Sequence, residues 1–288
     1  SPWLPTVGPM GDLSGLFRPD RVAVVGSTPR EGSIGRAITS NLLGGFDGEV
    51  VPVNPNHETV LGRPSVSSIG EAGDVDLAVI VVPASVAVSV LRAAGEAGVP
   101  NAVVITAGFS EVGEAGEDRE RELADVAVEH DMALVGPNSL GIMSTPAGLN
   151  ATFAPLSPLE GSISLLSQSG AFVTAAVDWA TDRGIGFRDV VSLGNEAVLD
   201  ETDFVEYWGD DPGTDVIVGY VEGIDDGREF VDRVREVTAE TPVVLLKSGR
   251  SAAGAAAAAS HTGSMAGSDR AYDAGFEQAG VLRADTAE

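Results

Sequence analysis

Residues 24–38 read VVGSTPREGSIGRAI, and this stretch indicates the fold of the first half of the chain. A buried strand ends at Gly26, a loop rich in glycine and serine follows, and a helix begins near Ser33 or Ile34. The unpaired backbone N–H groups at the start of a helix form a ready anion site. The stretch therefore predicts either a phosphate-binding loop or a plain tight turn between a strand and a helix.

This loop differs from the fingerprint of dinucleotide-binding folds. Its glycines, Gly26, Gly32 and Gly35, do not have the G-x-G-x-x-G spacing, because the loop is longer. The next strand ends at Asn54-Pro55, where a nicotinamide-binding domain carries an acidic residue for the ribose hydroxyls. Both departures indicate a nucleotide-like ligand other than NAD.

Short β-branched runs alternate with helical stretches along the whole chain. We expect strands at 21–27, 49–55, 76–83, 101–108 and 132–138, and then at 162–168, 187–194, 215–223, 241–249 and 280–284. Apolar strands separated by helices imply parallel sheets with right-handed crossovers. The segment 144–161, rich in Pro, Gly, Ser and Thr, separates the two series. We therefore expect two tandem doubly wound α/β domains, at 1–145 and 146–288, with ligands beyond the carboxyl ends of the strands.

The charge balance is strongly acidic, with 17 Lys and Arg against 43 Asp and Glu and a net charge of −26. The acids are spread along the chain, which disfavours nucleic acid and anionic membranes and is typical of a halophile's surface. No run approaches the roughly 18–20 apolar residues of a membrane helix, and the opening lacks the pattern of a secretory signal. Cysteine is absent, which excludes disulfides and thiolate chemistry. We expect a cytoplasmic protein.

Three places in the second half carry candidate site residues. In LLSQSGAFVTAAV (165–177) a strand runs into Ser169-Gly170 and an alanine-rich helix, whose N-terminus could hold a phosphate. Glu222 follows a strand in GYVEGID, and a carboxylate there either is solvated or fixes the tautomer of an imidazole. His261 lies in AAAAASHTGSMAGSD, a stretch that by itself fits a surface loop or a mobile, anion-binding side chain. The three histidines are scattered, so we expect no metal site.

Taken together, these segments resemble the α part of the NDP-forming acyl-CoA synthetases, also called ADP-forming acetate–CoA ligases, which are related to the succinyl-CoA synthetase α subunit. The resemblance covers about residues 14–286 and rests on eight segments in the expected order: VAVVGSTPREGSIGRAI, VVPVNP, VVITAGFSEVGEAG, VGPNSLGI, LLSQSGAF, SLGNEAVLDETDFVEYW, YVEGI and SHTGSMAGSD. It implies a Rossmann-like CoA-binding domain followed by a flavodoxin-like CoA-ligase domain.

The resemblance also implies roles for individual residues. The coenzyme A site would be lined by Gly26, Ser27, Ser33, Asn54, Val82, Pro83 and Gly108, with Asn138 near the thioester end. His261 matches the family's phosphohistidine, and Glu222 matches the glutamate that supports it. Ser169 and Gly170 match the helix start that holds the phosphate.

The activity that the resemblance implies is acyl-CoA + ADP + phosphate ⇌ carboxylic acid + ATP + CoA, through an acyl phosphate and a phosphohistidine. The family also needs an ATP-grasp domain, which supplies the ADP and Mg²⁺ site. Nothing in this chain resembles it, so we expect it on a partner subunit or elsewhere in a longer fused chain, within an oligomer. This chain alone would be incomplete as an enzyme.

Two other functions compete with the ligase. One is a CoA-sensing regulatory module without turnover, which would not need both His261 and Glu222. The other is a nicotinamide dehydrogenase, against which Asn54 and the missing dinucleotide fingerprint both argue.

Overall fold

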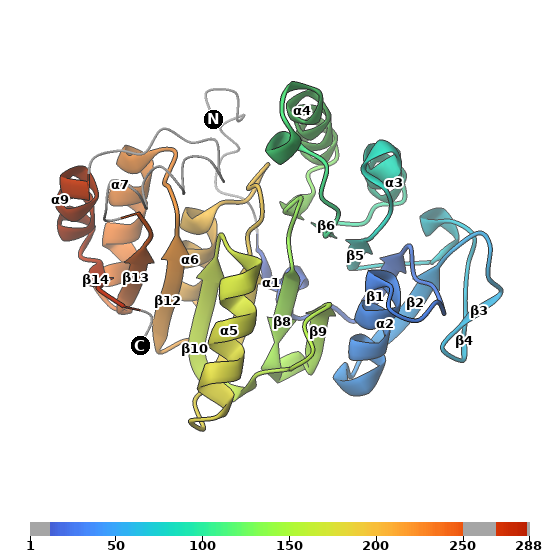
Figure 1. Cartoon of the computed structure of the whole chain (residues 1–288), viewed down its shortest axis with the longest axis horizontal. Coiled ribbons are helices and arrows are strands. Elements are labelled where there is room, and N and C mark those ends of the chain that lie inside the picture. The colour runs from blue at the N-terminus through green and yellow to red at the C-terminus, as the bar shows by residue number, and fades with distance from the viewer. Residues whose placement is uncertain (1–11, 250–268, 287–288) are drawn as a thin grey trace.

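The computed structural model describes residues 12–249 and 269–286, which form two α/β regions side by side (Figure 1). The sheet of the first region is parallel throughout, and the sheet of the second region is mostly parallel. His261 lies outside the described residues. No helix of the described chain has the length and apolar character needed to cross a membrane.

The first sheet has the strand order β2-β1-β5-β6-β7 and is parallel throughout. Its strands are β1 (Arg21–Val25), β2 (Glu49–Val53), β5 (Leu77–Ile80), β6 (Asn101–Val104) and β7 (Ala133–Val135). Beyond β2, Val66 forms a single parallel bridge with Val53. The strand order thus reverses between β1 and β5, and this reversal makes a topological switch point at which such folds bind ligands.

Helices and short elements complete this region. The helices are α1 (Ser14–Phe17), α2 (Ile34–Gly45), α3 (Ala84–Glu96) and α4 (Glu114–Glu129), with 3₁₀ turns η1 (Ile69–Glu71) and η2 (Ser110–Val112). A small antiparallel ribbon, β3 (Thr59–Val60) with β4 (Arg63–Pro64), follows β2. The strands of the sheet pack as continuous apolar runs, as expected where helices cover a parallel sheet.

The second sheet has the order β14-β13-β12-β10-β11-β8-β9. Its parallel strands are β10 (Leu159–Ser167), β11 (Gly186–Ser192), β12 (Val216–Val221), β13 (Val243–Lys247) and β14 (Leu282–Ala284). The helices are α5 (Gly170–Thr181), α6 (Glu201–Gly209), α7 (Gly227–Thr238) and α9 (Asp269–Ala279). From β10 the chain goes first to β11 on one side and then to β12 on the other, so a second switch point lies between β10 and β12.

The segment expected to be a linker, 144–161, contributes to this second sheet. It holds the 3₁₀ turn η3 (Thr145–Ala147), the strand β9 (Leu149–Thr152) and the start of β10. The preceding strand β8 (Gly141–Ser144) pairs antiparallel with both β11 and β9. The sequence did not predict this hairpin, because each strand has four residues and lacks a β-branched run. The domain limits at 145 and 146 stay a prediction.

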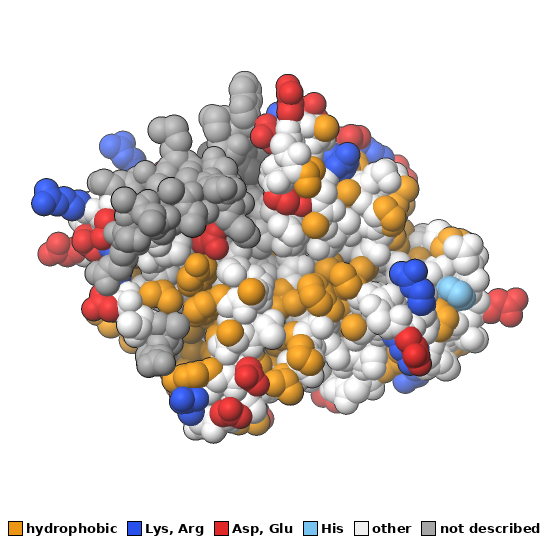
Figure 2. Space-filling view, in the orientation of Figure 1, with side chains coloured by type: hydrophobic (Ala, Val, Ile, Leu, Met, Phe, Trp, Pro, Cys, Tyr) orange, Lys and Arg blue, Asp and Glu red, His pale blue; other side chains and the backbone are white. Residues whose placement is uncertain are grey.

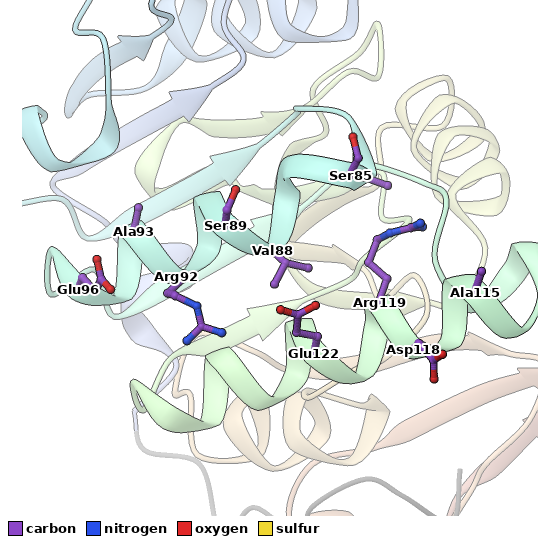
Figure 3. A pocket seen from close by; sticks show the side chains of 11 residues that line it. Ser85, Val88, Ser89, Arg92, Ala93, Glu96, Ala115, Asp118, Arg119 and Glu122 are labelled. Atoms are coloured by element: carbon purple, nitrogen blue, oxygen red, sulfur yellow. The ribbon is translucent and has the colours of Figure 1, made fainter.

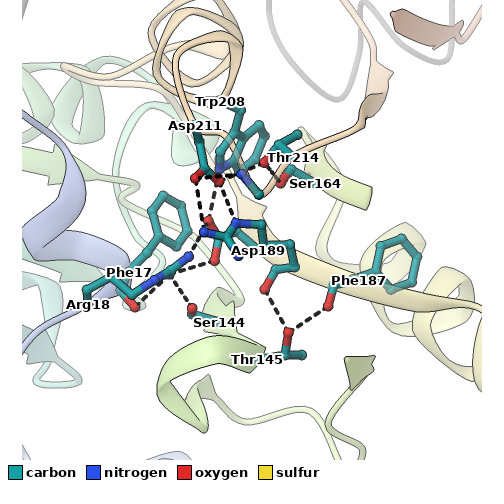
Figure 4. A network of polar contacts seen from close by, with 12 residues as sticks. Phe17, Arg18, Ser144, Thr145, Ser164, Phe187, Asp189, Trp208, Asp211 and Thr214 are labelled. Carbon is teal, nitrogen blue, oxygen red and sulfur yellow. Dashed lines mark hydrogen bonds and ion pairs between the residues drawn. The ribbon is translucent and has the colours of Figure 1, made fainter. Parts of the chain in front are cut away.

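A buried polar network joins the two regions (Figure 4). Arg18, which follows α1, forms an ion pair with the fully buried Asp189 of β11, with 2.8 Å between Nη1 and Oδ1. Trp208 Nε1 donates a hydrogen bond to the other carboxylate oxygen of Asp189 at 3.2 Å. Phe17 stacks on Tyr207 with 5.7 Å between ring centroids. The start of the described chain is therefore fixed to β11 by an ion pair and to α6 by aromatic packing.

The surface carries acidic side chains over many elements, with hydrophobic side chains exposed across the middle of one face (Figure 2). The large exposed apolar residues are Ile34, Val86, Val112, Val128, Phe153, Leu156, Leu159 and Leu282.

Candidate functional site

A cleft of about 980 Å³ opens at the first switch point, beyond the carboxyl ends of β1, β2 and β5. Gly26, Asn54, Val82 and Pro83, all predicted to bind the ligand, line this cleft. They come together because each lies at or just after the end of a parallel strand, and these ends meet at one edge of the sheet.

The backbone at the end of β1 requires glycine. Gly26 has φ +97°, and a Cβ atom there would lie 2.4 Å from the carbonyl oxygen of Val81. A Cβ atom on Gly35 would lie 2.2 Å from the carbonyl oxygen of Gly26. These two glycines let the start of α2 approach the strand end closely. Ser33 caps this helix, since its Oγ accepts a hydrogen bond from Arg36 N at 3.3 Å.

Ser27 and Asn54 connect the loops after β1 and β2. Asn54 Nδ2 donates to the carbonyl oxygen of Ser27 at 2.7 Å, and Asn54 Oδ1 accepts from Asn56 N at 2.9 Å. Ser27 is fully buried, with its Oγ 2.6 Å from Thr39 Oγ1. Ser27 therefore supports the cleft from beneath, whereas Asn54 lines it.

Several polar residues of the cleft were not among the predicted ones. They are Thr28, Arg30, Asn56, His57, Ser67, Ser68 and Ser89. Arg30 supplies a cation, and no Asp or Glu is among the described residues that line the cleft, which suits an anionic group in a strongly acidic protein. Arg30 lies within the glycine-rich loop of residues 24–38, so the sequence could have indicated it as a site residue. The bridge between Val53 and Val66 brings Ser67 and Ser68 to the cleft, and the sequence pattern gave no sign of it.

Gly108 and Asn138 are not among the residues that line this cleft, and they lie toward the second region. Gly108, which follows β6, has φ +106°, and its N–H donates to the Glu111 carboxylate. Asn138, which follows β7, donates from Nδ2 to Asn195 Oδ1 at 3.1 Å. Asn195 Nδ2 in turn donates to Glu111 Oε2 at 2.7 Å. Asn138 therefore contacts the β11–α6 loop at the junction of the two regions, and Gly108 is linked to that loop through Glu111.

A separate groove of about 510 Å³ runs between α3 and α4 (Figure 3). Arg92, Arg119 and Glu122 extend into it. Both cations have partners, since Arg92 pairs with Glu129 at 3.0 Å and Arg119 donates to the carbonyl oxygen of Gly108. Charges of both signs lie side by side here, so the groove does not present a site for one class of ligand.

The second switch point brings the other predicted residues together. Ser169 caps α5, with its Oγ accepting from Phe172 N at 3.3 Å, and Gly170 is the first residue of that helix. Glu222 directly follows β12, whose Tyr220 is paired with Ser167 of β10. The helix start and the carboxylate therefore lie at the carboxyl ends of neighbouring strands.

The chain segment that contains His261 connects to this same edge. β13 pairs with β12, with Lys247 opposite Val221, and the described chain ends at Gly249 just after β13. It resumes at Asp269, the first residue of α9. Burial, together with the charge of Arg283, lowers the pKa of Lys247.

Three acids near the second switch point were not predicted. Desolvation, with repulsion from Asp200, raises the pKa of Glu196 to about 8. Desolvation, with repulsion from Asp203, raises the pKa of Asp200 to about 6. Burial and repulsion from Glu196 raise the pKa of Glu201 well above its ordinary value. Carboxyl groups with such shifts gather at functional sites. No group of three or more potential metal ligands occurs among residues 12–249 and 269–286.

Two family models match the chain, one on each half. Residues 20–145 match the CoA binding domain, and residues 160–288 match the succinyl-CoA ligase like flavodoxin domain. With the two switch points, these matches confirm the fold class predicted from the sequence, a CoA-binding domain followed by a flavodoxin-like domain.

Curated relatives narrow this class further. The chain is 48% identical over 274 residues to acetate–CoA ligase (ADP-forming) I of Archaeoglobus fulgidus, covering 95% of this chain and 40% of the relative. It is 45% identical over 280 residues to the α subunit of acetate–CoA ligase (ADP-forming) I of Pyrococcus furiosus, covering 95% of this chain and 61% of that subunit.

A solved structure agrees with both relatives. Acetyl-coenzyme A synthetase 1 of Ca. Korarchaeum cryptofilum, in complex with phosphate and ADP, superposes with a TM-score of 0.91 at 43% identity. The match covers 96% of this chain and 60% of that one. The chain is therefore similar to the α part of the ADP-forming acetate–CoA ligases, the resemblance predicted from the sequence. It spans about 40 to 60% of the length of the relatives described here.

Proposed function

We propose that this chain is the CoA-binding and phosphoryl-carrying part of an ADP-forming acyl-CoA ligase. The observation that carries the proposal is the meeting of Ser169, Gly170 and Glu222 at one sheet edge, to which the segment containing His261 is directly connected. The reaction is acyl-CoA + ADP + phosphate ⇌ carboxylic acid + ATP + CoA.

The chemistry has three steps. Phosphate attacks the acyl-CoA carbonyl carbon and the CoA thiolate leaves, which gives an acyl phosphate. The imidazole of His261 attacks the phosphorus and the carboxylate leaves. ADP then takes the phosphoryl group from the phosphohistidine to give ATP. In the reverse direction, ATP drives acyl-CoA formation.

Each predicted residue of the second switch point has a distinct role in this scheme. His261 must be neutral to act as a nucleophile, and a hydrogen bond to Glu222 stabilises the positive charge that the ring acquires. The backbone N–H groups at the start of α5, at Ser169 and Gly170, offset the charge on the phosphoryl group.

Coenzyme A would occupy the cleft at the first switch point. Gly26, Asn54, Val82 and Pro83 line it, while Ser27 and Ser33 hold the loop and the helix start in place. Gly108 and Asn138 would meet the thioester end, because they lie toward the second region. The contact between Asn138 and Asn195 supports this direction for the ligand.

An ATP-grasp domain or β subunit is the required partner, and it would bind ADP with Mg²⁺. The Pyrococcus furiosus relative is named as an α subunit, which supports a partner on a separate chain. A fused arrangement is the alternative, supported by the Archaeoglobus fulgidus relative, of which this chain covers 40%. The oligomer, the cytoplasmic location and the halophilic surface stay predictions.

Phosphohistidine labelling tests the proposal. The chain is mixed with an ATP-grasp partner and radiolabelled ATP, and we expect an acid-labile label that is lost in His261→Asn and reduced in Glu222→Gln. His130→Asn is the matched control, because His130 lies at the end of α4, away from both switch points. A CoA-sensing module would bind CoA without any labelling. Labelling that persists in His261→Asn would contradict the assigned carrier.

A further inference from the structure

We propose that Gln168 is a positioning residue of the phosphoryl-transfer site: its side-chain amide fixes the backbone at Glu222 relative to the start of α5, and Glu196 and Glu201 orient that amide. The inference rests on the proposed function for its consequence, but not for its geometry. Gln168 precedes Ser169 in the chain and touches the loop after β12.

The side-chain amide of Gln168 uses its full hydrogen-bonding capacity. Its Oε1 accepts from the backbone N–H of Glu222 at 2.5 Å and of Gly223 at 3.1 Å. Its Nε2 donates to the carbonyl oxygen of Gly223 at 2.8 Å and to Glu196 Oε2 at 3.0 Å. An amide offers two donors and two acceptor lone pairs, so all four are used.

The backbone of Gln168 adds a further link to β12, because its N–H donates to the carbonyl oxygen of Tyr220 at 3.0 Å. One residue therefore bridges the switch point by both its main chain and its side chain. The N-cap of α5 is the next residue, so Gln168 sets the spacing between the predicted phosphate donors and the predicted carboxylate.

The partners of Gln168 allow one orientation of its amide. In the opposite orientation, Oε1 would face the carbonyl oxygen of Gly223 and the carboxyl oxygens of Glu196, while Nε2 would face two N–H groups. Buried polar groups without complementary partners are costly, so the amide stays as described.

Glu196 and Glu201 form a carboxyl pair behind this amide. Their side chains hydrogen-bond to each other, which requires a proton between them. Glu201 is buried, and its Oε2 lies 3.5 Å from Gln168 Nε2. Neither acid forms an ion pair with a Lys or Arg of the described chain. The pair therefore presents acceptor oxygens to Gln168 without a competing cation.

Loss of this bridge would leave two N–H groups of the Glu222 loop without their acceptor. A displacement of about 1 Å in a catalytic group can cost about 100-fold in rate. We expect the transfer of phosphoryl groups to slow while coenzyme A, bound at the other switch point, is held as before.

The experiment compares the wild-type chain with Gln168→Ala, Gln168→Glu and the double variant Gln168→Glu/Glu196→Gln, each with the ATP-grasp partner. The double variant exchanges the amide and the acid, so a donor again faces an acceptor between the two positions. Gln278→Ala is the matched control, because Gln278 is exposed on α9. The readouts are the rate of His261 labelling by ATP, CoA affinity by calorimetry, and hydrogen exchange of the Glu222 and Gly223 amides.

We expect both single Gln168 variants to label about 10- to 100-fold more slowly at unchanged CoA affinity. In the double variant, the logarithm of the labelling rate should recover at least about half of the decrease seen in Gln168→Glu, as expected for coupled neighbours. The Glu222 and Gly223 amides should exchange faster in Gln168→Ala. Wild-type exchange at these amides, a wild-type labelling rate, or no recovery in the double variant would each overturn the proposal. If the wild type neither labels nor binds CoA, the proposed function fails, and hydrogen exchange still decides whether the bridge exists.

Discussion

The switch point between β1 and β5 is open, with a cleft of about 980 Å³ at its strand ends, whereas the switch point between β10 and β12 is crossed by the side chain of Gln168. The first is shaped by backbone, with Gly26 in a conformation and space that exclude a side chain. The second is shaped by side chains, including acids whose pKa values are raised. The same topology therefore leaves an open cleft in one case and a side-chain bridge between strand ends in the other.

The largest expected effect comes from breaking the buried polar network around Asp189, which joins the two α/β regions. Asp189→Ala leaves Arg18 and Trp208 Nε1 without their buried acceptor. Removing one partner of a buried ion pair costs about 3–5 kcal/mol of the free energy of unfolding. Denaturant unfolding should show a lower midpoint. Asp118→Asn, at an exposed pair with Arg121, should change it by less than about 1 kcal/mol. Equal effects would contradict the role of the junction.

The open switch point is tested by filling its backbone space. Gly26→Val places a β-branched side chain at φ +97° and against the carbonyl oxygen of Val81. We expect CoA affinity to fall by about 100-fold or more, equivalent to about 2.7 kcal/mol, and to fall much more than the rate of His261 labelling. Gly44→Ala, in open space on α2, is the control. Calorimetry that finds wild-type affinity in Gly26→Val would place the ligand elsewhere.

The switch point between β10 and β12 is tested by the pH dependence of the protein's stability. The pKa of Glu196 is about 8 in the folded protein and about 4.3 when unfolded. Between these values the folded state binds the extra proton, so this group's contribution to stability is lost as the pH rises from about 5 to 8.

Glu196→Gln removes that loss. The difference between the thermal midpoints of Glu196→Gln and wild type should therefore increase from pH 5 to pH 8. An effect of about 1 kcal/mol corresponds to an increase of about 2–4 °C. Glu122→Gln, on the exposed surface of α4, provides the control. A difference from wild type that stays constant with pH would show that Glu196 is not desolvated as described.

The smallest effects concern the helix caps, which the two switch points share. Ser33→Ala and Ser169→Ala each remove an acceptor for a helix N–H, and each should cost about 1 kcal/mol. Only Ser169→Ala should also slow His261 labelling. Ser40→Ala, on the exposed face of α2, should cost less than about 0.5 kcal/mol in the same unfolding measurements. Slower His261 labelling in Ser33→Ala would contradict the assignment of the two caps to different sites.

The sequence predicted the parallel strands well, because strands buried on both faces appear as apolar, β-branched runs. It did not predict β8 and β9, whose GIMS and LNAT segments are short and pair antiparallel. At the sites, the sequence singled out residues that directly follow strands, such as Asn54, which lines the first cleft. Gln168 and Glu196 were not, because their roles depend on contacts between loops that are distant in sequence.

The most direct test of the central claim is a calorimetric titration of this chain with coenzyme A, with NAD as the control, in molar KCl. We expect CoA to bind and NAD not to bind, since the first cleft has Asn54 in place of the ribose-binding acid. Binding of NAD without CoA would contradict it, as would a failure of CoA to bind even with the ATP-grasp partner present.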